Sequence, residues 1–217
     1  MDIKITEITP SPSGEEVFVK MRVSNGFSAG YAKGEIAADF FFSLGLPTEI
    51  KEPIIIDEEF YGRIEYAMRK TDAVKMGINL LSYSQNTARS LSQKLTQRGV
   101  KKEIADDAVE YLKDCGYINE YEMALALIED MAKRRYFGKM RIKADLFAKG
   151  FSGETLSRAI EDADVDFTQA CVLRIKQMGG LNIFATKSDR LKAIPALRRY
   201  GFTVDEVRAA INIIENE

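Results

Sequence analysis

The chain has 217 residues, of which 46% are hydrophobic and 29% are charged, and its formal net charge is −2. This composition predicts a folded protein with a buried core and excludes a polycation that would bind nucleic acid indiscriminately. No run of about 18 apolar residues is present to span a membrane, and the N-terminus shows no secretory signal. The two cysteines, Cys115 and Cys171, are expected to be reduced thiols in a cytoplasmic protein.

The chain contains no histidine, and this absence argues against an enzyme. Zinc and non-haem iron sites lose their usual ligand, and Ser-His-Asp and Cys-His catalysis are excluded. Neither a GxxxxGK(S/T) loop nor a GxGxxG loop is present to hold phosphates. Carboxylate chemistry with magnesium stays open, but no acidic cluster indicates it. We therefore expect no catalytic residue, no cofactor and no metal.

The first 35 residues are predicted to form β-structure. Apolar residues over 3–8 indicate a short strand, which the prolines and the glycine of 10–14 end. Residues 17–23 alternate between apolar and polar side chains, as in a half-buried strand. Asn25-Gly26 predicts a two-residue hairpin turn. The alternation of Phe27, Ala29 and Tyr31 then predicts the returning strand.

Residues 37–44 are predicted to form a short helix that ends at Gly45 and Pro47. The side chains of Phe40, Phe41 and Phe42 in this helix cannot all point into a single core, because consecutive residues of a helix point in different directions. We expect it to be sandwiched between the hairpin and the helical body. From Asp57, a predicted N-cap, the sequence is helical. Its periodicity does not decide between one long helix and two helices joined near Thr71.

An internal repeat organises the helical part. Gly99, Gly150 and Gly201 are spaced by 51 residues, and an apolar residue follows each of them. The residue four positions before each glycine is a leucine (Leu95, Leu146 and Leu197). The residue eight positions before each glycine is also apolar (Leu91, Ile142 and Ala193). Twelve residues before each glycine are candidate N-caps, namely Thr87, Gly138 and Asp189. Glu103, Glu154 and Asp205 then suit the first turn of a following helix.

The repeat predicts three-helix units of about 50 residues, which must stack on one another to bury their faces. Helices near 71–84, 119–135 and 166–178 are expected to open the three units. We therefore expect a mainly α fold, a curved helical solenoid of three tandem three-helix repeats after a small N-terminal β-hairpin. The expected segments are 1–56 (hairpin and short helix), 57–118 (linking helix and repeat 1), 119–165 (repeat 2) and 166–217 (repeat 3, divergent, with Pro195 inside a helix).

Two strings around the second repeat resemble the RecX family of regulatory proteins. Gly116-Tyr117-Ile118-Asn119-Glu120 is similar to the turn that opens the family's second repeat. Gly138-Lys139-Met140-Arg141-Ile142, running to Leu146 and Lys149-Gly150-Phe151, is similar to its second-repeat signature. The resemblance covers residues 71–215. It departs from the family pattern at Ser90, where members usually carry an acid.

The resemblance implies a non-enzymatic protein that binds along the groove of the RecA–DNA filament and modulates, usually inhibits, RecA in recombination, repair and the SOS response. Weak single-stranded DNA binding is compatible with it, and nothing indicates an oligomer, so a monomer is expected. Two alternatives stay open. One is a helical-repeat protein that binds nucleic acid directly, against which the pI of 5.5 and the lack of a basic recognition helix argue. The other is a scaffold for an unrelated partner.

Basic residues concentrate in the middle of the chain, whereas residues 1–70 carry twelve acids and eight bases. Within 133–149, seven bases stand against Asp145 alone, and we expect this corner to attract an acidic or anionic partner. The first candidates are Arg134, Arg135, Lys139, Arg141, Lys143 and Lys149, and the second set is Arg89, Lys94, Arg98 and Lys101. The alternative is a solvated helix face for each charge. Tyr117, Phe137 and Phe151 are aromatics of the kind that stack on bases, but their positions favour core packing.

Overall fold

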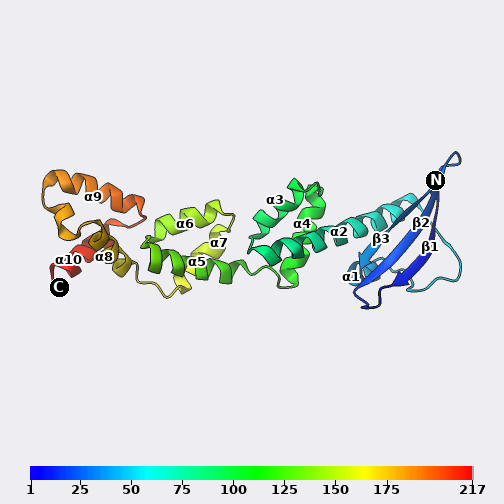
Figure 1. Cartoon of the computed structure of the whole chain (residues 1–217), viewed down its shortest axis with the longest axis horizontal. Helices are drawn as coiled ribbons and strands as arrows, with labels where there is room; N and C mark the ends of the chain where they lie inside the picture. Colours follow the sequence, from blue (N-terminus) through cyan, green and yellow to red (C-terminus); the bar gives the residue numbers. More distant parts are fainter. Residues whose placement is uncertain (217) are drawn as a thin grey trace. The chain divides into compact units, whose positions relative to one another are not determined.

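The computed structural model describes residues 1–216 (Figure 1). The chain is mainly α-helical with a small antiparallel sheet at its N-terminus, which confirms the expected fold class. It divides into two compact units, Met1–Ser84 with Leu91–Tyr117, and Gln85–Ser90 with Ile118–Glu217. The finer division into four segments stays a prediction. None of the helices within residues 1–216 combines the length and apolarity needed to cross a bilayer.

The sheet has four strands, β1 (Asp2–Pro10), β2 (Glu16–Ser24), β3 (Ala29–Ala37) and β4 (Ile54–Ile56), in the order β3-β2-β1-β4. Ser24 pairs with Ala29, so the β2–β3 turn has four residues and the expected two-residue turn is wrong. The Asn25 side chain holds this turn by accepting hydrogen bonds from the amides of Phe27 and Ser28 (3.1 and 2.9 Å). Phe27 is therefore fully exposed in the turn and does not belong to the returning strand.

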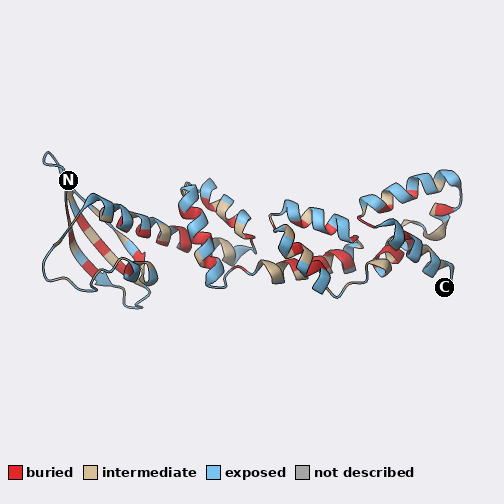
Figure 2. Ribbon diagram, turned by 180° about the vertical axis from the view of Figure 1, so that it is seen from behind, coloured by how far each residue is buried: buried red, intermediate tan, exposed pale blue. Residues whose placement is uncertain are grey.

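One face of the sheet packs against α1 (Ala38–Ser43) and α2 (Glu58–Tyr83), and the alternation along the strands selects that face (Figure 2). The buried side chains of the strands are Ile3, Ile5, Ile8, Val17, Val19, Met21 and Ile36. Phe41 is fully buried and Phe40 packs edge-on against Tyr111 (4.8 Å between ring centroids), as expected for the triplet. The expectation is wrong for Phe42, which is 61% exposed.

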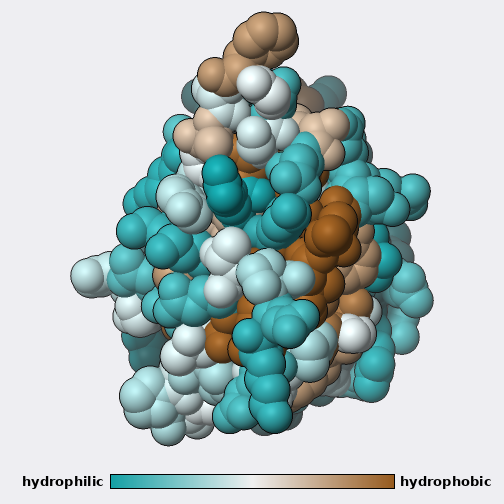
Figure 3. Space-filling model, turned by 90° about the vertical axis from the view of Figure 1, so that its right-hand side faces the viewer, coloured by the Kyte–Doolittle hydropathy of each residue, from teal (hydrophilic) through white to brown (hydrophobic). Residues whose placement is uncertain are grey.

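Some apolar side chains of the N-terminal unit stay at the surface. Figure 3 looks onto the N-terminal unit and shows apolar side chains in a strip among polar ones. Ile55 of β4 is 72% exposed and Met1 is 60% exposed. The inner face of the sheet is thus covered, whereas its edge at β4 and its outer face stay open to solvent.

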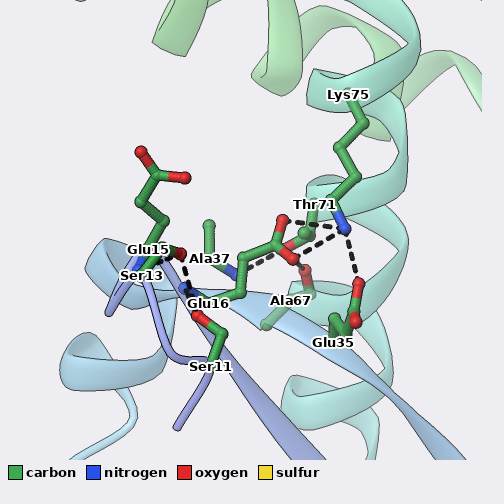
Figure 4. Close-up of polar contacts among 9 residues, drawn as sticks. All are labelled: Ser11, Ser13, Glu15, Glu16, Glu35, Ala37, Ala67, Thr71 and Lys75. Carbon is green, nitrogen blue, oxygen red and sulfur yellow. Dashed lines mark hydrogen bonds and ion pairs between the residues drawn. The ribbon is translucent and has the colours of Figure 1, made fainter.

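Two polar side chains of α2 hold the end of the sheet (Figure 4). The Lys75 ammonium lies 2.7 Å from a Glu16 carboxylate oxygen and 2.6 Å from a Glu35 oxygen, and so joins β2 and β3 to the helix. The Lys75 hydrogen bond holds the pKa of Glu35 below its ordinary value. One turn earlier, the buried hydroxyl of Thr71 accepts a hydrogen bond from the Ala37 amide and donates one to the Ala67 carbonyl (2.9 Å each).

The helical part begins with α2, a single helix whose N-cap is Asp57, so residues 58–83 are not divided near Thr71. The helices that follow are α3 (Ala88–Gln97), α4 (Lys102–Asp114), α5 (Glu120–Arg135), α6 (Lys139–Ala148), α7 (Gly153–Asp162), α8 (Phe167–Met178), α9 (Lys187–Arg199) and α10 (Val204–Glu215), with a 3-10 turn, η1 (Gly180–Phe184), before α9. Each of the three expected units therefore contains three α-helices.

The repeat is confirmed at its glycines and its apolar rows. Gly99, Gly150 and Gly201 have φ of +92°, +100° and +95°, the left-handed conformation that favours glycine. The apolar positions four and eight residues before each glycine are buried in all three repeats, and so are the alanines nine residues after each glycine, at 108, 159 and 210. The N-cap expectation holds at Thr87 and Gly138 but is wrong at Asp189. There α9 starts one turn earlier, because Thr186 and Asp189 form a capping box. Pro195 lies inside α9, as expected.

Candidate partner-binding surfaces

The α6 helix presents a mixed apolar and basic surface. It buries Ile142 and Leu146 completely, so the opposite side of the helix faces solvent. Met140 and Phe147 lie on that side and are 63% and 57% exposed, and Lys139 and Lys143 lie beside them. We call Lys139, Met140, Lys143 and Phe147 the outer face of α6. Sequence analysis singled out its two lysines but not its two apolar residues, whose exposure depends on which side of the helix is buried.

Two of the predicted arginines are neutralised within their own helices. Arg134 pairs with Asp130 (3.2 Å) and Arg141 pairs with Asp145 (2.8 Å). Lys133 likewise contacts Glu129 (3.3 Å) and Asp164 (3.8 Å). The charge excess of 133–149 is therefore smaller in the structure than in the sequence, because Glu129 and Asp130 in α5 and Asp164 after α7 add to Asp145 as partners of these bases.

The other candidates in this corner keep their charge available. Within residues 1–216, no carboxylate forms an ion pair with Arg135, Lys139, Lys143 or Lys149. Lys143 donates a hydrogen bond to the Ser157 hydroxyl (3.0 Å). Lys149 and Arg135 also have a structural role through their carbonyl oxygens, which accept hydrogen bonds from Thr87 (3.2 Å) and Arg174. The exposed, unpaired bases thus gather on and next to α6.

The second candidate set is divided between the two compact units. Arg89 belongs to the same compact unit as α6, and its side chain lies against the Gly150 turn. Lys94, Arg98 and Lys101 belong to the other unit. There Arg98 and Lys101 line a shallow hollow together with Arg69 and Asp72, whereas Lys94 is half-buried on α3. The role of both candidate sets in partner binding stays a prediction.

The three aromatics have different environments. Phe151 is buried, and Phe137 is half-buried and packs against the core of the second repeat, as expected. Tyr117 is 55% exposed, so the expectation of core packing is wrong there. Among the described residues, no cluster of three or more cysteine, aspartate or glutamate side chains is arranged to hold a metal ion.

A second basic surface, which was not predicted from the sequence, lies on the outer face of the sheet. Lys4, Lys20, Arg22 and Lys33 lie there beside Phe18 and Tyr31. The number of charged residues over 1–70 did not indicate this surface, because acids outnumber bases in that segment. The period-two alternation of residues 17–23 already places Phe18, Lys20 and Arg22 on one face, and the same argument applied to the neighbouring strands could have found the surface.

No protein-family model matches the chain. Its sequence is nevertheless similar to several regulatory proteins named RecX. The chain is 31% identical over 134 residues to the regulatory protein RecX of Halorhodospira halophila. This alignment covers 61% of this chain and 82% of the relative. It is 29% identical over 137 residues to that of Xanthomonas citri (63% and 84% covered). It is 25% identical over 182 residues to that of Clostridioides difficile (82% and 81% covered).

Solved structures show the same fold. A crystal structure of a regulatory protein RecX superposes with a TM-score of 0.68 at 17% identity and covers 99% of this chain and 100% of that chain. The crystal structure of RecX from Lactobacillus salivarius gives a TM-score of 0.61 at 20% identity and covers 69% of this chain and 98% of that chain. The first of these likenesses extends over the N-terminal sheet as well as the helical repeats.

Proposed function

The chain belongs to the RecX family of regulatory proteins, and we propose that it binds the RecA–DNA filament and inhibits RecA in DNA recombination and repair. A regulator of this kind acts by occupying a surface of its partner, and needs neither a catalytic residue nor a cofactor. The proposal is supported by family membership together with one feature of the chain, the outer face of α6.

The outer face of α6 has the composition of a protein-binding surface. Protein interfaces commonly place apolar anchors such as methionine and phenylalanine at the centre and charged groups at the rim. Met140 and Phe147 are exposed anchors of this type, and Lys139 and Lys143 are the charged groups beside them. The unpaired lysines favour a partner surface that carries acids, and they speed its approach. A purely phosphate-binding surface would not need the two apolar side chains.

The experiment that tests this proposal measures single-stranded-DNA-dependent ATP hydrolysis and strand exchange by RecA, titrated with this protein at two salt concentrations. We expect the wild-type protein to slow both activities at less than one molecule per RecA subunit. Higher salt should weaken the effect, because it screens the lysines. A wild-type protein without effect on either activity at any ratio would contradict the proposal and leave the scaffold alternative.

Variants locate the surface. We expect Met140→Ser with Phe147→Ser, and separately Lys139→Ala with Lys143→Ala, to inhibit RecA at least tenfold less well. Lys102→Ala with Arg208→Ala is the matched control: both side chains are about three-quarters exposed and pair with an acid of their own helix. If the two α6 double variants inhibit RecA as well as the control double variant does, the interface does not include the outer face of α6. Arg134→Ala with Arg141→Ala should have a smaller effect than the lysine pair, because Asp130 and Asp145 already neutralise these arginines.

A further inference from the structure

The outer face of the N-terminal sheet carries an unusual arrangement of like charges. Lys20 on β2 lies directly opposite Lys33 on β3, and Lys4 on β1 lies directly opposite Arg22 on β2. Like charges that face each other across neighbouring strands destabilise a sheet. Two such pairs side by side therefore cost folding free energy, and an anionic partner would remove that cost.

Among residues 1–216, only one of these four bases, Lys4, forms an ion pair with a carboxylate. Glu35 and Glu16 are held by Lys75 at the end of the sheet, and Asp2 pairs with Lys4 (3.4 Å). Glu7 lies opposite Lys20 on β1, but the two side chains form no ion pair. Among residues 1–216, no carboxylate forms an ion pair with Lys20, Arg22 or Lys33. Three cations on one sheet face are thus available to an external anion.

Two aromatic rings lie among these cations. Tyr31 is 65% exposed and pairs across the strands with Arg22, and the Lys20 ammonium lies 5.0 Å from the centre of its ring. Phe18, half-buried, is two residues before Lys20 on the same face of β2. Aromatic rings that lie between bases on an open surface suit a ligand with alternating negative charges and flat faces. A flexible single strand of nucleic acid has both features.

We propose that the outer face of the sheet binds single-stranded nucleic acid, with Lys20, Arg22 and Lys33 at the phosphates and Tyr31 and Phe18 under the bases. Stacking on the rings requires unpaired bases, so a single strand is preferred to a duplex. The surface acts without RecA and is separate from the outer face of α6, so it goes beyond the proposed function. A negative result for RecA inhibition would not affect the proposal for the sheet, and a negative result for single-strand binding would not affect the proposal for α6.

The direct test is fluorescence anisotropy of a labelled oligothymidine of about 15 nucleotides, a length that spans one binding fold, titrated with the full chain in the absence of RecA. We expect Lys20→Ala with Lys33→Ala to weaken binding at least tenfold. The salt slope should fall by about 1.4, since each phosphate contact to a single strand contributes about 0.7. Lys102→Ala with Arg208→Ala removes the same net charge elsewhere and should change affinity less than twofold.

Stacking is tested separately from charge. Tyr31→Ala should weaken binding about tenfold, whereas Tyr31→Phe, which keeps the ring, should bind as the wild type does. Polyglutamate of matched length should compete poorly, because it offers charge without flat bases. Equal competition by polyglutamate, or equal binding of duplex and single strand, would overturn the proposal in favour of a general anion or acidic-protein surface.

A charge reversal distinguishes lost binding from lost folding. Lys33→Glu places a carboxylate opposite Lys20 on the edge strand, so an unfavourable pair becomes a favourable one. We expect the thermal midpoint to rise by about 1–2 °C while oligothymidine binding falls more than tenfold, and Lys33→Gln should lie between the two proteins in both measurements. Wild-type binding by Lys33→Glu, or absence of oligothymidine binding by the wild-type protein at low salt, would overturn the proposal.

Discussion

Gly138 and Gly201 lie in direct backbone contact. The Gly138 amide donates a hydrogen bond to the carbonyl oxygen of Tyr200 (2.8 Å), and the Gly201 carbonyl accepts one from the Met140 amide (3.2 Å). The N-cap of α6 in the second repeat thus docks on the turn that ends α9 in the third. One repeat earlier, the Thr87 hydroxyl donates to the Lys149 carbonyl beside Gly150 (3.2 Å), at positions 51 residues before these. The same joint therefore occurs twice.

Gly138→Ala tests this joint. A Cβ at residue 138 would overlap the Gly201 carbonyl group, although the φ of −80° at Gly138 is one that alanine adopts freely. We expect a loss of about 1–3 kcal/mol in the free energy of unfolding, caused by crowding alone, measured by circular dichroism in urea. Gly153→Ala is the control, since no atom lies within 4 Å of its added Cβ. Alanine is the better helix former, so that variant should be at least as stable as the wild type. Equal stability of the two variants would mean that the backbone contact is not tight in solution.

Thr87→Val tests the equivalent joint between the first and second repeats. The Thr87 hydroxyl accepts a hydrogen bond from the Ser90 amide (3.2 Å) as the cap of α3 and donates to Lys149. Valine keeps the shape and removes both bonds, so we expect a loss of about 1–2 kcal/mol in unfolding free energy. Thr203→Val is the matched variant, because Thr203 caps α10 but forms no hydrogen bond to another repeat within the described residues. A loss at Thr203 equal to or larger than that at Thr87 would show that the inter-repeat bond contributes nothing.

The repeat could be predicted from sequence because its determinants are local and periodic. A glycine with positive φ, a leucine one turn earlier and an alanine in the next helix recur at constant spacing, and each reflects a requirement of one turn or one helix face. The joint between Gly138 and Gly201 was not predicted. Glycine at an N-cap position satisfies the local rules by itself, and its close approach to a residue 63 positions later leaves no local pattern.

The candidate site was predicted only in part, for a similar reason. Counting charges within 133–149 left out Asp130, which lies one helical turn before Arg134 and neutralises it. The β4 strand was not predicted from sequence. Its three isoleucines form a strand by pairing with β1, about fifty residues earlier, and three residues are too few to show a period. On the outer face of the sheet, period-two alternation places Lys20 and Lys33 on one side, but only the register between β2 and β3 sets them opposite each other.

Arg174 is a structural arginine that sequence analysis did not single out, and Arg174→Lys tests its role. Its guanidinium donates hydrogen bonds to the carbonyl oxygens of Arg135 and Tyr136 at the end of α5 and lies 4.1 Å from the centre of the Tyr200 ring. A lysine keeps the charge but cannot donate to both carbonyls while it stacks on the ring. We expect a loss of about 1–2 kcal/mol in unfolding free energy, against less than about 0.5 kcal/mol for the exposed control Arg198→Lys. Indistinguishable losses would show that Arg174 holds the second and third repeats together only through its charge.

The two cysteines should differ in reactivity and in their effect on stability at alkaline pH. Cys115 is exposed after α4, whereas Cys171 is completely buried on α8, and burial raises the pKa of the Cys171 thiol to about 12. At pH 8 we expect Ellman's reagent to titrate one thiol rapidly in the folded protein and two in denaturant, and Cys115→Ala should abolish the rapid phase.

The direction of the pH effect follows from the same shift. Between the ordinary thiol pKa of about 9 and the raised value of about 12, the folded state retains a proton that the unfolded state releases. The contribution of Cys171 to stability is therefore complete below pH 9 and declines as the pH rises toward 12. Urea unfolding from pH 8 to pH 10.5 should show a steeper loss of stability for the wild type than for Cys171→Ala. Parallel pH profiles, or two rapidly reacting thiols in the folded protein, would mean that solvent reaches Cys171.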